Sequence, residues 1–479
     1  MNDALEHYIQ TARWFGGKGR DFRVGEVRRV GELGEAEPGA PVTIELVTVE
    51  YDGTAETELY QLPLVYYPEE QDRLGHALVG VWEDERVGHA FVYDALQDRH
   101  AAALWLDAFA EERTGEDLVF HRLPGHELDL EAQASLLSGE QSNSSVAFGE
   151  DSLMKVFRKV TPGRNPDIEI HEALTRAESI HVAALYGWLE APLGDGEPMH
   201  LAMLQQFLRT ASDGWDLARA SVRDLYAEGD LHADEVGGDF AAESHRLGVA
   251  TAEVHDALAA SFPTHTWGRT ELAALAEAMR GRLDAAVEVV PGLGDHAGRL
   301  RDAFDALAAL EGPVSVQRIH GDFHLGQTLR TVKGWKIVDF EGEPAKPLAE
   351  RTRPDSPWRD VAGMLRSFDY AALAVEADVE EDGAQIAYRA GEWAERNRNA
   401  FLDGYAESSG RTPEGTLDEE QRVLLHAYEV DKAVYETVYE ARNRPDWLHI
   451  PLSAIERLTR DPESPAAANH PHDQEASTS

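Results

Sequence analysis

The stretch that most constrains the fold of this chain runs from His320 to Glu343. It begins with the residues HGDFHLGQ and ends with DFEGE. Between them, Thr328 to Val338 alternates apolar and polar residues around a Lys333-Gly334 turn signal, which predicts a β-hairpin. Such a hairpin would bring Gln327 and Asp339 side by side.

This arrangement supplies the groups that phosphoryl transfer from a magnesium nucleotide requires. One carboxylate must align the attacking hydroxyl, while an amide oxygen and a second carboxylate hold the metal. We therefore predict Asp322 as the catalytic base and Gln327 and Asp339 as Mg²⁺ ligands, because Mg²⁺ takes oxygen ligands. A free Asp has a pKa near ~3.9, so Asp322 would be ionised at neutral pH.

A zinc site is the alternative use of this segment. His320, Asp322 and His324 lie at i, i+2 and i+4, a spacing that points three side chains one way on a strand. That arrangement leaves Gln327 without a role, so we prefer the magnesium interpretation. His320 is then expected to brace the loop.

Composition limits the class of protein. The chain has 479 residues, enough for two or more domains, and 43% of them are hydrophobic. No apolar run is long enough to span a membrane, and residues 1–10 lack the apolar core of a secretory signal. Cysteine is absent, which excludes disulfides and thiolate chemistry. These features favour a cytoplasmic protein.

The net charge is strongly negative, at 44 − 88 = −44. Such a surface repels nucleic acid and anionic membranes, so neither is expected as a partner. The simpler explanation of this acidity is a GC-rich coding bias, which we prefer. The alternative is that the protein is adapted to high salt. In either case a phosphate site must depend on local cations, Mg²⁺ and backbone amides.

Secondary-structure patterns divide the chain into a β-rich first half and a helical second half. We expect a β-rich cap over residues 1–90, a nucleotide-binding subdomain over 91–207, a helical lobe over 208–460, and a disordered tail over 461–479. The predicted fold class is α+β, with the two lobes of a kinase-like fold.

A second motif lies in the β-rich half. Gln141 to Ser145 is a small polar stretch that could offer amides and hydroxyls to phosphate oxygens, although an ordinary turn has the same composition. Lys155 follows on a predicted strand between apolar residues, and a buried lysine needs an anionic partner. Glu169, on the next predicted helix, is the expected partner. A lysine that snorkels to the surface is the alternative.

The motifs HGDFHLGQ, DFEGEP and EQSNSS resemble those of the actinobacterial maltokinases, ATP-dependent sugar kinases with an aminoglycoside-phosphotransferase-like fold. The resemblance runs from about Gln141 to Leu458. It implies phosphorylation of maltose at the anomeric hydroxyl, giving maltose 1-phosphate for α-glucan and glycogen synthesis, and a possible trehalose synthase partner. Carried over residue by residue, it assigns phosphate and nucleotide contacts to Gln141, Ser142, Asn143, Ser144, Ser145 and Lys155.

The same resemblance places the adenine-contacting strand at Met203 to Leu208, with Gln206 as a contact. Here Leu204-Gln205-Gln206-Phe207 departs from the expected pattern. His449 also stands where a proline is expected.

The sugar site is expected on the helix predicted over Leu417 to Arg442. Tyr435 and Tyr439 form an aromatic stripe beside its apolar face, although packing tyrosines produce the same pattern. The residues expected to bind the sugar are His324, Glu341, Asp431, Tyr435, Glu436, Tyr439 and Arg442.

Two other interpretations stay open. Asp431, Glu436 and Glu440 could form an acidic pocket for an ammonium group, so glucosamine or another sugar could be the acceptor. A non-catalytic partner subunit of a glucan-metabolism enzyme is the other alternative, against which the intact Lys155 and Asp322 argue. Asp360, on a helix after the hairpin, is expected to accept hydrogen bonds from the backbone of the catalytic loop.

Overall fold

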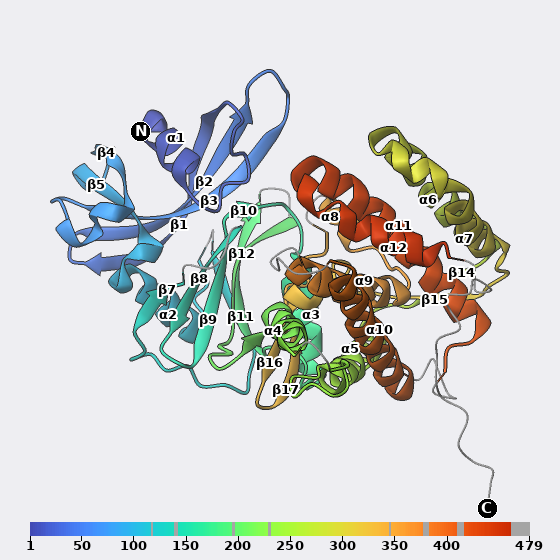
Figure 1. Ribbon diagram of the computed structural model, residues 1–479. Coiled ribbons are helices and arrows are strands. Elements are labelled where there is room, and N and C mark those ends of the chain that lie inside the picture. Colours follow the sequence, from blue (N-terminus) through green and yellow to red (C-terminus); the bar gives the residue numbers. More distant parts are fainter. Residues whose placement is uncertain are drawn as a thin grey trace, which may run out of the picture. The chain divides into compact units, whose positions relative to one another are not determined.

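A computed structural model describes residues 1–115, 118–137, 142–193, 197–228, 231–343, 346–376, 383–409 and 416–460 (Figure 1). The chain forms two compact units. Unit 1 comprises Met1–Ala211 and Asp339–Arg351, and unit 2 comprises Ser212–Val338 and Thr352–Ser479. The short segment from Asp339 thus belongs to the same unit as the β-rich half.

Unit 1 begins with helix α1 (Asn2–Thr11) and an antiparallel sheet, drawn in blue in Figure 1. The sheet has the order β1-β2-β3-β5-β4, with bounds β1 (Phe22–Glu37), β2 (Ala40–Tyr51), β3 (Thr57–Tyr67), β4 (Leu78–Asp84) and β5 (Gly88–Asp94). Asp52-Gly53 is a typical turn sequence and lies between β2 and β3, where Gly53 has a positive φ of 73°.

A second antiparallel sheet follows in unit 1. Its order is β6-β11-β12-β9-β8-β7, with bounds β6 (Val119–Arg122), β7 (Ala134–Leu136), β8 (Asn143–Phe148), β9 (Ser152–Phe157), β11 (Leu185–Leu193) and β12 (Glu197–Gln206). Helices α2 (Arg99–Ala110) and α3 (Pro166–Arg176) accompany it. The proline and glycine residues between Ala191 and His200 predict a turn, but this prediction is wrong for most of the segment, because β11 and β12 extend into it.

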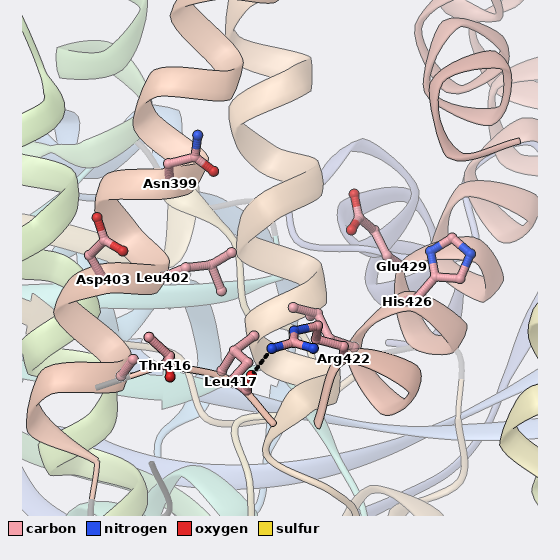
Figure 2. Close-up of a pocket in the computed structure, with 10 residues that line it drawn as sticks. Asn399, Leu402, Asp403, Thr416, Leu417, Arg422, His426 and Glu429 are labelled. Carbon is pink, nitrogen blue, oxygen red and sulfur yellow. Dashed lines mark hydrogen bonds between the residues drawn. The ribbon is translucent and has the colours of Figure 1, made fainter. Parts of the chain in front are cut away.

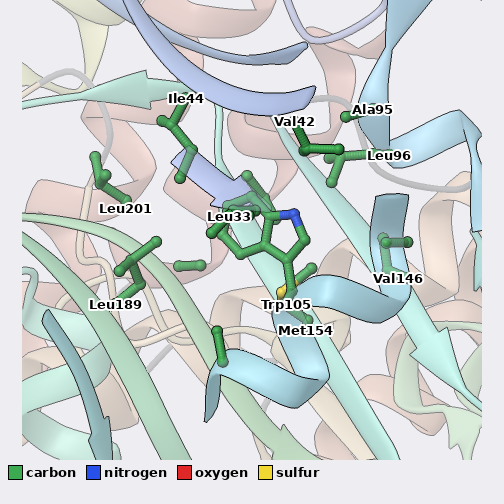
Figure 3. Packing of buried hydrophobic residues seen from close by; sticks show 14 of the residues in the cluster. Leu33, Val42, Ile44, Ala95, Leu96, Trp105, Val146, Met154, Leu189 and Leu201 are labelled. Atoms are coloured by element: carbon green, nitrogen blue, oxygen red, sulfur yellow. The ribbon is translucent and has the colours of Figure 1, made fainter. Parts of the chain in front are cut away.

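The residue pattern from Leu153 to Val160 predicts a single strand, but in the structure this strand is interrupted at Arg158. Its last part forms β10 (Lys159–Val160), which pairs with β3 of the first sheet. The two sheets also share one apolar core, with Trp105 of α2 fully buried in it (Figure 3). Around Trp105 lie Leu33, Val42 and Ile44 from the first sheet and Val146, Met154, Leu189 and Leu201 from the second. The boundary expected near residue 90 falls within β5.

Unit 2 is mostly helical. Its longer helices are α4 (Gly214–Ala227), α5 (Ala241–Ser261), α6 (Arg269–Val289), α7 (Ala297–Ala309), α9 (Trp358–Glu376), α10 (Gly383–Ser408), α11 (Glu419–Asn443) and α12 (His449–Leu458). The strands are β13 (Ser212–Asp213), β14 (His265–Trp267), β15 (Val314–Val316), β16 (Thr328–Thr331) and β17 (Gly334–Ile337). Within the described part of the chain, no helix is both long and apolar enough to cross a membrane.

Helices α5 and α10 approach closely at two glycines. A Cβ on Gly248 would lie 2.1 Å from the Phe401 carbonyl oxygen, and one on Gly404 would lie 2.1 Å from that of His245. Backbone therefore packs against backbone at this crossing, which any larger residue would force apart.

Candidate active site

Lys155 of β9 lies inside a cluster of three carboxylates in unit 1. Its Nζ is 2.8 Å from Asp339 Oδ1, 2.9 Å from Glu341 Oε1 and 3.0 Å from Asp167 Oδ2. Burial acts to lower the pKa of Lys155, but the three carboxylates raise it well above its usual value. The lysine is therefore charged, and the formal charge of these four groups is 1 − 3 = −2.

Asp167 is fixed by the start of helix α3. Asn165 caps this helix, its side chain accepting a hydrogen bond from the Asp167 N–H at 2.8 Å. The buried Asp167 carboxylate also accepts from the Phe340 N–H at 2.9 Å. Burial alone would raise the pKa of Asp167, but Lys155 and His171 hold it well below its usual range.

The structure thus pairs Lys155 with Asp167, where the sequence pointed to Glu169. Both residues lie on α3, two positions apart. Residues at i and i+2 of a helix face different directions, so Asp167 meets Lys155 while Glu169 occupies another, half-buried position.

The predicted phosphate loop leads into β8. The Asn143 side-chain amide donates to Glu341 Oε1 at 3.2 Å, and Ser145 is directly opposite Lys155 in the strand register. Ser144 points to the other face, as strand alternation requires, where its Oγ accepts from Arg158 Nε at 2.8 Å. Its hydroxyl is therefore directed away from Lys155. Ser142 is exposed, and Gln141 lies outside the described residues.

The predicted adenine-contacting strand corresponds to β12, which pairs with β11 and β9. Gln206 ends this strand, half-buried, and its N–H donates to the Ala184 carbonyl at 2.8 Å. Its contact with a base stays a prediction.

The carboxylate cluster has the ligand chemistry for a divalent cation. Ligand oxygens of Asp167, Asp339 and Glu341 lie within 4.8 Å of one another, and the formal charge of −2 that includes Lys155 matches Mg²⁺. Asp339 has a φ of 66°, a left-handed conformation that Asp tolerates better than most residues. Glu341, expected to contact the sugar, lies in this cluster instead.

The hairpin predicted in unit 2 is present. β16 pairs antiparallel with β17, and the Val338 N–H donates to the Gln327 carbonyl at 3.1 Å. The turn lies at Val332-Lys333, one residue earlier than expected, with Gly334 opening β17. Joint metal binding by Gln327 and Asp339 stays a prediction.

His320 braces the loop that carries Asp322, as expected. Its Nδ1 accepts from the Asp322 N–H at 3.4 Å, so its Nε2 carries the proton that is donated to the Val338 carbonyl at 3.0 Å. Both ring nitrogens are thus engaged with backbone. His324 Nδ1 likewise accepts from the Gly326 N–H at 3.1 Å. These contacts leave no support for the zinc alternative.

Asp360 of α9 holds the same loop, confirming the role predicted for it. Its carboxylate accepts from the His320 N–H at 2.7 Å and the Gly321 N–H at 2.9 Å. Burial acts to raise the pKa of Asp360, but the hydrogen bond and charge interaction with His255, the nearby His320 and the Gly321 N–H lower it. Asp360 is therefore an ionised, buried anchor for the loop.

Lys432 of α11 is a site residue that the sequence reasoning missed. Its Nζ is 3.7 Å from Asp322 Oδ1 and 5.4 Å from the centre of the Tyr435 ring. Two features of the sequence could have indicated it. Lys432 is one of only seven lysines in the chain, and it lies three residues before Tyr435 on the same helix.

The aromatic stripe of α11 lies beside this lysine. Tyr435 and Tyr439 are 39% and 44% exposed, and their ring centres are 6.5 Å apart. Arg444 lies over Tyr439 at 5.5 Å and over Trp447 at 4.4 Å. Arg442, predicted for this role, is exposed on the last turn of the helix.

Arginines pair with the acidic groups expected to bind an ammonium. Arg282 donates to both oxygens of Asp431 at 2.8 Å. Glu436 is buried and contacts the buried Arg366 at 2.8 Å. Arg444 contacts the third of these carboxylates, Glu440, at 2.6 Å.

A separate cavity of about 620 Å³ lies between α10 and α11 in unit 2 (Figure 2). Asp403, Arg422, His426 and Glu429 line it, together with leucines from both helices. None of the predicted site residues does so. Glu429 belongs to the buried ion-pair network that includes Arg398 and Arg457.

Comparisons with known proteins agree with this arrangement. The maltokinase N-terminal cap domain matches residues 8–98, and the phosphotransferase enzyme family matches residues 223–398. A glucosamine kinase of Streptacidiphilus jiangxiensis is 33% identical over 322 residues, covering 65% of this chain and 70% of that protein. One from Mycolicibacterium smegmatis is 26% identical over 331 residues, covering 67% and 78%.

A solved glucosamine kinase in complex with glucosamine, ADP and inorganic phosphate superimposes with a TM-score of 0.67. It is 25% identical, and the match covers 95% of this chain and 99% of that one. The fold and the two groups of site residues therefore define a phosphotransferase enzyme, α+β in class, with a β-rich N-terminal region and a helical C-terminal region. The chain belongs to the family of kinases that join a maltokinase N-terminal cap to a phosphotransferase domain.

Proposed function

We propose that this kinase transfers the γ-phosphoryl group of ATP to the anomeric hydroxyl of maltose. The observation that carries the proposal is the position of Lys432, 3.7 Å from Asp322. A cation beside the catalytic carboxylate favours a neutral acceptor over an ammonium, because like charges repel. Tyr435 and Tyr439 supply exposed ring faces beside it for sugar rings.

In this proposal each group has a defined task. Asp322 accepts a hydrogen bond from the acceptor hydroxyl and aligns its oxygen with the phosphorus. Lys155 donates to phosphate oxygens of the nucleotide while Asp167 retains it in position. Gln327 and Asp339 would hold Mg²⁺, which would supply positive charge that offsets the negative charge on the phosphates.

Glucosamine is the second candidate acceptor, because the relatives reported above are named glucosamine kinases. Against it stand the ion pairs of Asp431 and Glu436, which already satisfy the carboxylates that an ammonium would seek. Recognition of the amine would require other groups. A trehalose synthase partner is a prediction from the family resemblance alone.

The test is ADP release with magnesium ATP against maltose, glucose, glucosamine, trehalose and no sugar. Selective turnover of maltose, with phosphate on the anomeric carbon, is expected. Turnover of glucosamine and not maltose would refute the acceptor while retaining the kinase assignment.

The variant Asp322→Asn tests the catalytic base in the same assay. It keeps the size of the side chain but removes its charge, so nucleotide binding should persist while turnover falls by about 10²–10⁴-fold. Unchanged turnover would refute the role of Asp322, and absence of turnover in wild type would favour the non-catalytic alternative.

A further inference from the structure

One face of helix α9 follows the backbone of the catalytic loop. Asp360, Gly363 and Ser367 are spaced by three and four residues, which places them on the same side of the helix. All three meet main-chain atoms of the loop between His320 and Leu325.

The contacts occur in the order of the chain. Asp360 accepts from the first two amides of the loop, as described above. A Cβ on Gly363 would lie 2.5 Å from the Phe323 carbonyl oxygen, so only glycine leaves room for this oxygen. Ser367 Oγ then accepts from the Leu325 N–H at 2.9 Å. Asp322 lies between the first and second of these contacts.

The end of the loop is also held by Thr328 and by helix α4. Thr328 Oγ1 donates to the Leu325 carbonyl at 2.7 Å. Gly214, the first residue of α4, packs against both groups, because a Cβ there would lie 2.1 Å from Thr328 Oγ1 and 2.9 Å from the Leu325 oxygen. The backbone of the loop is therefore held at both ends, at His320-Gly321 and at Leu325.

We propose that Gly363 and Ser367 are positioning residues that set the place of the Asp322 carboxylate through the backbone of the loop. Gly363 acts by leaving space for the Phe323 carbonyl oxygen, and Ser367 acts by accepting a hydrogen bond from the buried Leu325 N–H. The kinetic part of this inference rests on the proposed function, in which Asp322 aligns the acceptor hydroxyl. The structural part does not.

Gly363→Ala and Ser367→Ala test the proposal in the full chain. Matched controls are Gly248→Ala, whose Cβ would meet the Phe401 carbonyl, and Ser244→Ala, which removes a buried hydroxyl that donates to Asn397 Oδ1 at 2.7 Å. These controls repeat the same changes in α5, at contacts with α10.

Amide hydrogen exchange of peptides covering residues 319–327 gives the structural readout. Loss of the Ser367 acceptor leaves the Leu325 amide buried without a partner, so its exchange should rise about tenfold. Gly363→Ala should also raise the exchange rate of this peptide, whereas both controls should leave that rate unchanged. Wild-type exchange in both loop-facing variants would overturn the proposal, whatever the acceptor of the enzyme is.

Steady-state kinetics give the second readout, with the acceptor sugar that the panel assay identifies. Gly363→Ala should lower kcat by about 100-fold, because displacing a catalytic group by roughly 1 Å has that effect, while KM for ATP stays within about twofold. The controls, compared per folded protein, should keep kcat within about twofold. A kcat that remains at the wild-type value in both Gly363→Ala and Ser367→Ala would refute the positioning role. A wild type without turnover for every acceptor would refute the proposed function, and the exchange measurement would still decide the inference.

Discussion

Replacing Lys155 by Met tests the carboxylate cluster most directly. The Nζ of Lys155 is within 3.0 Å of oxygens of Asp167, Asp339 and Glu341. Met fills similar volume without charge, so the variant leaves three neighbouring carboxylates with no shared cation. Because Asp167 is buried, loss of the lysine charge should destabilise the fold strongly.

The magnitude follows from that burial. Removing one partner of a buried ion pair destabilises a protein by about 3–5 kcal/mol, because the remaining charge stays out of water. Lys159→Met provides the control on the neighbouring strand. Lys159 is 54% exposed and pairs with Glu58, so its loss should change stability by less than about 1 kcal/mol.

Urea unfolding in the absence of Mg²⁺ and nucleotide measures both variants. The expected result is a large loss of unfolding free energy for Lys155→Met and almost none for Lys159→Met. Nucleotide affinity should also fall only in the first. Equal stability of the two variants would show that the cluster is solvated and that the burial argument is wrong.

Three further predictions concern other residues. Lys432→Met should raise KM for the sugar about tenfold with KM for ATP unchanged, because Lys432 lies beside Asp322, which is proposed to align the sugar hydroxyl. An effect on KM for ATP alone, measured by steady-state kinetics, would contradict this. Burial, with nearby cations, lowers the pKa of His200 from 6.5 to about 4, so its neutral form stabilises the fold above pH 6.5 and this stability is lost as pH falls toward 4. His200→Asn should therefore remove about 3 kcal/mol of the pH dependence of unfolding over that interval, and an unaltered slope would refute it. Arg366→Met should lower the unfolding free energy by about 3–5 kcal/mol, because it leaves the buried Glu436 unpaired; a calorimetric or urea measurement within 1 kcal/mol of wild type would oppose this.

Much of the fold could be predicted from the sequence because its signals are local. The turn at Asp52-Gly53, the β16–β17 hairpin and the long helices follow from turn chemistry and periodicity over a few residues. The interruption at Arg158 could not be predicted this way. The buried Arg158 pairs with Asp94, 64 residues away, and no local pattern signals such a contact.

The candidate site shows the same division. The role of His320 could be predicted because it contacts backbone only two residues away. The role of Asp360 could be predicted from its position on the helix that follows the hairpin. Asp167 was missed in favour of Glu169, since the choice depends on how α3 is rotated against β9. Lys432 was missed because its importance comes from its distance to Asp322, more than a hundred residues earlier in the chain.

The placement of Asp339–Arg351 in unit 1 has a consequence for synthesis of the chain on the ribosome. Lys155 and Asp339, which pair in the finished protein, are 184 residues apart. At roughly 5–20 residues per second, the ribosome needs about 10–40 s to make the intervening chain. During that interval the nascent β-rich segment has Asp167 but lacks Asp339 and Glu341. Unit 1 can therefore be completed only after Ser212–Val338, about half of unit 2, has been translated. The cluster thus forms late in synthesis, and a chain truncated before Asp339 would lack it.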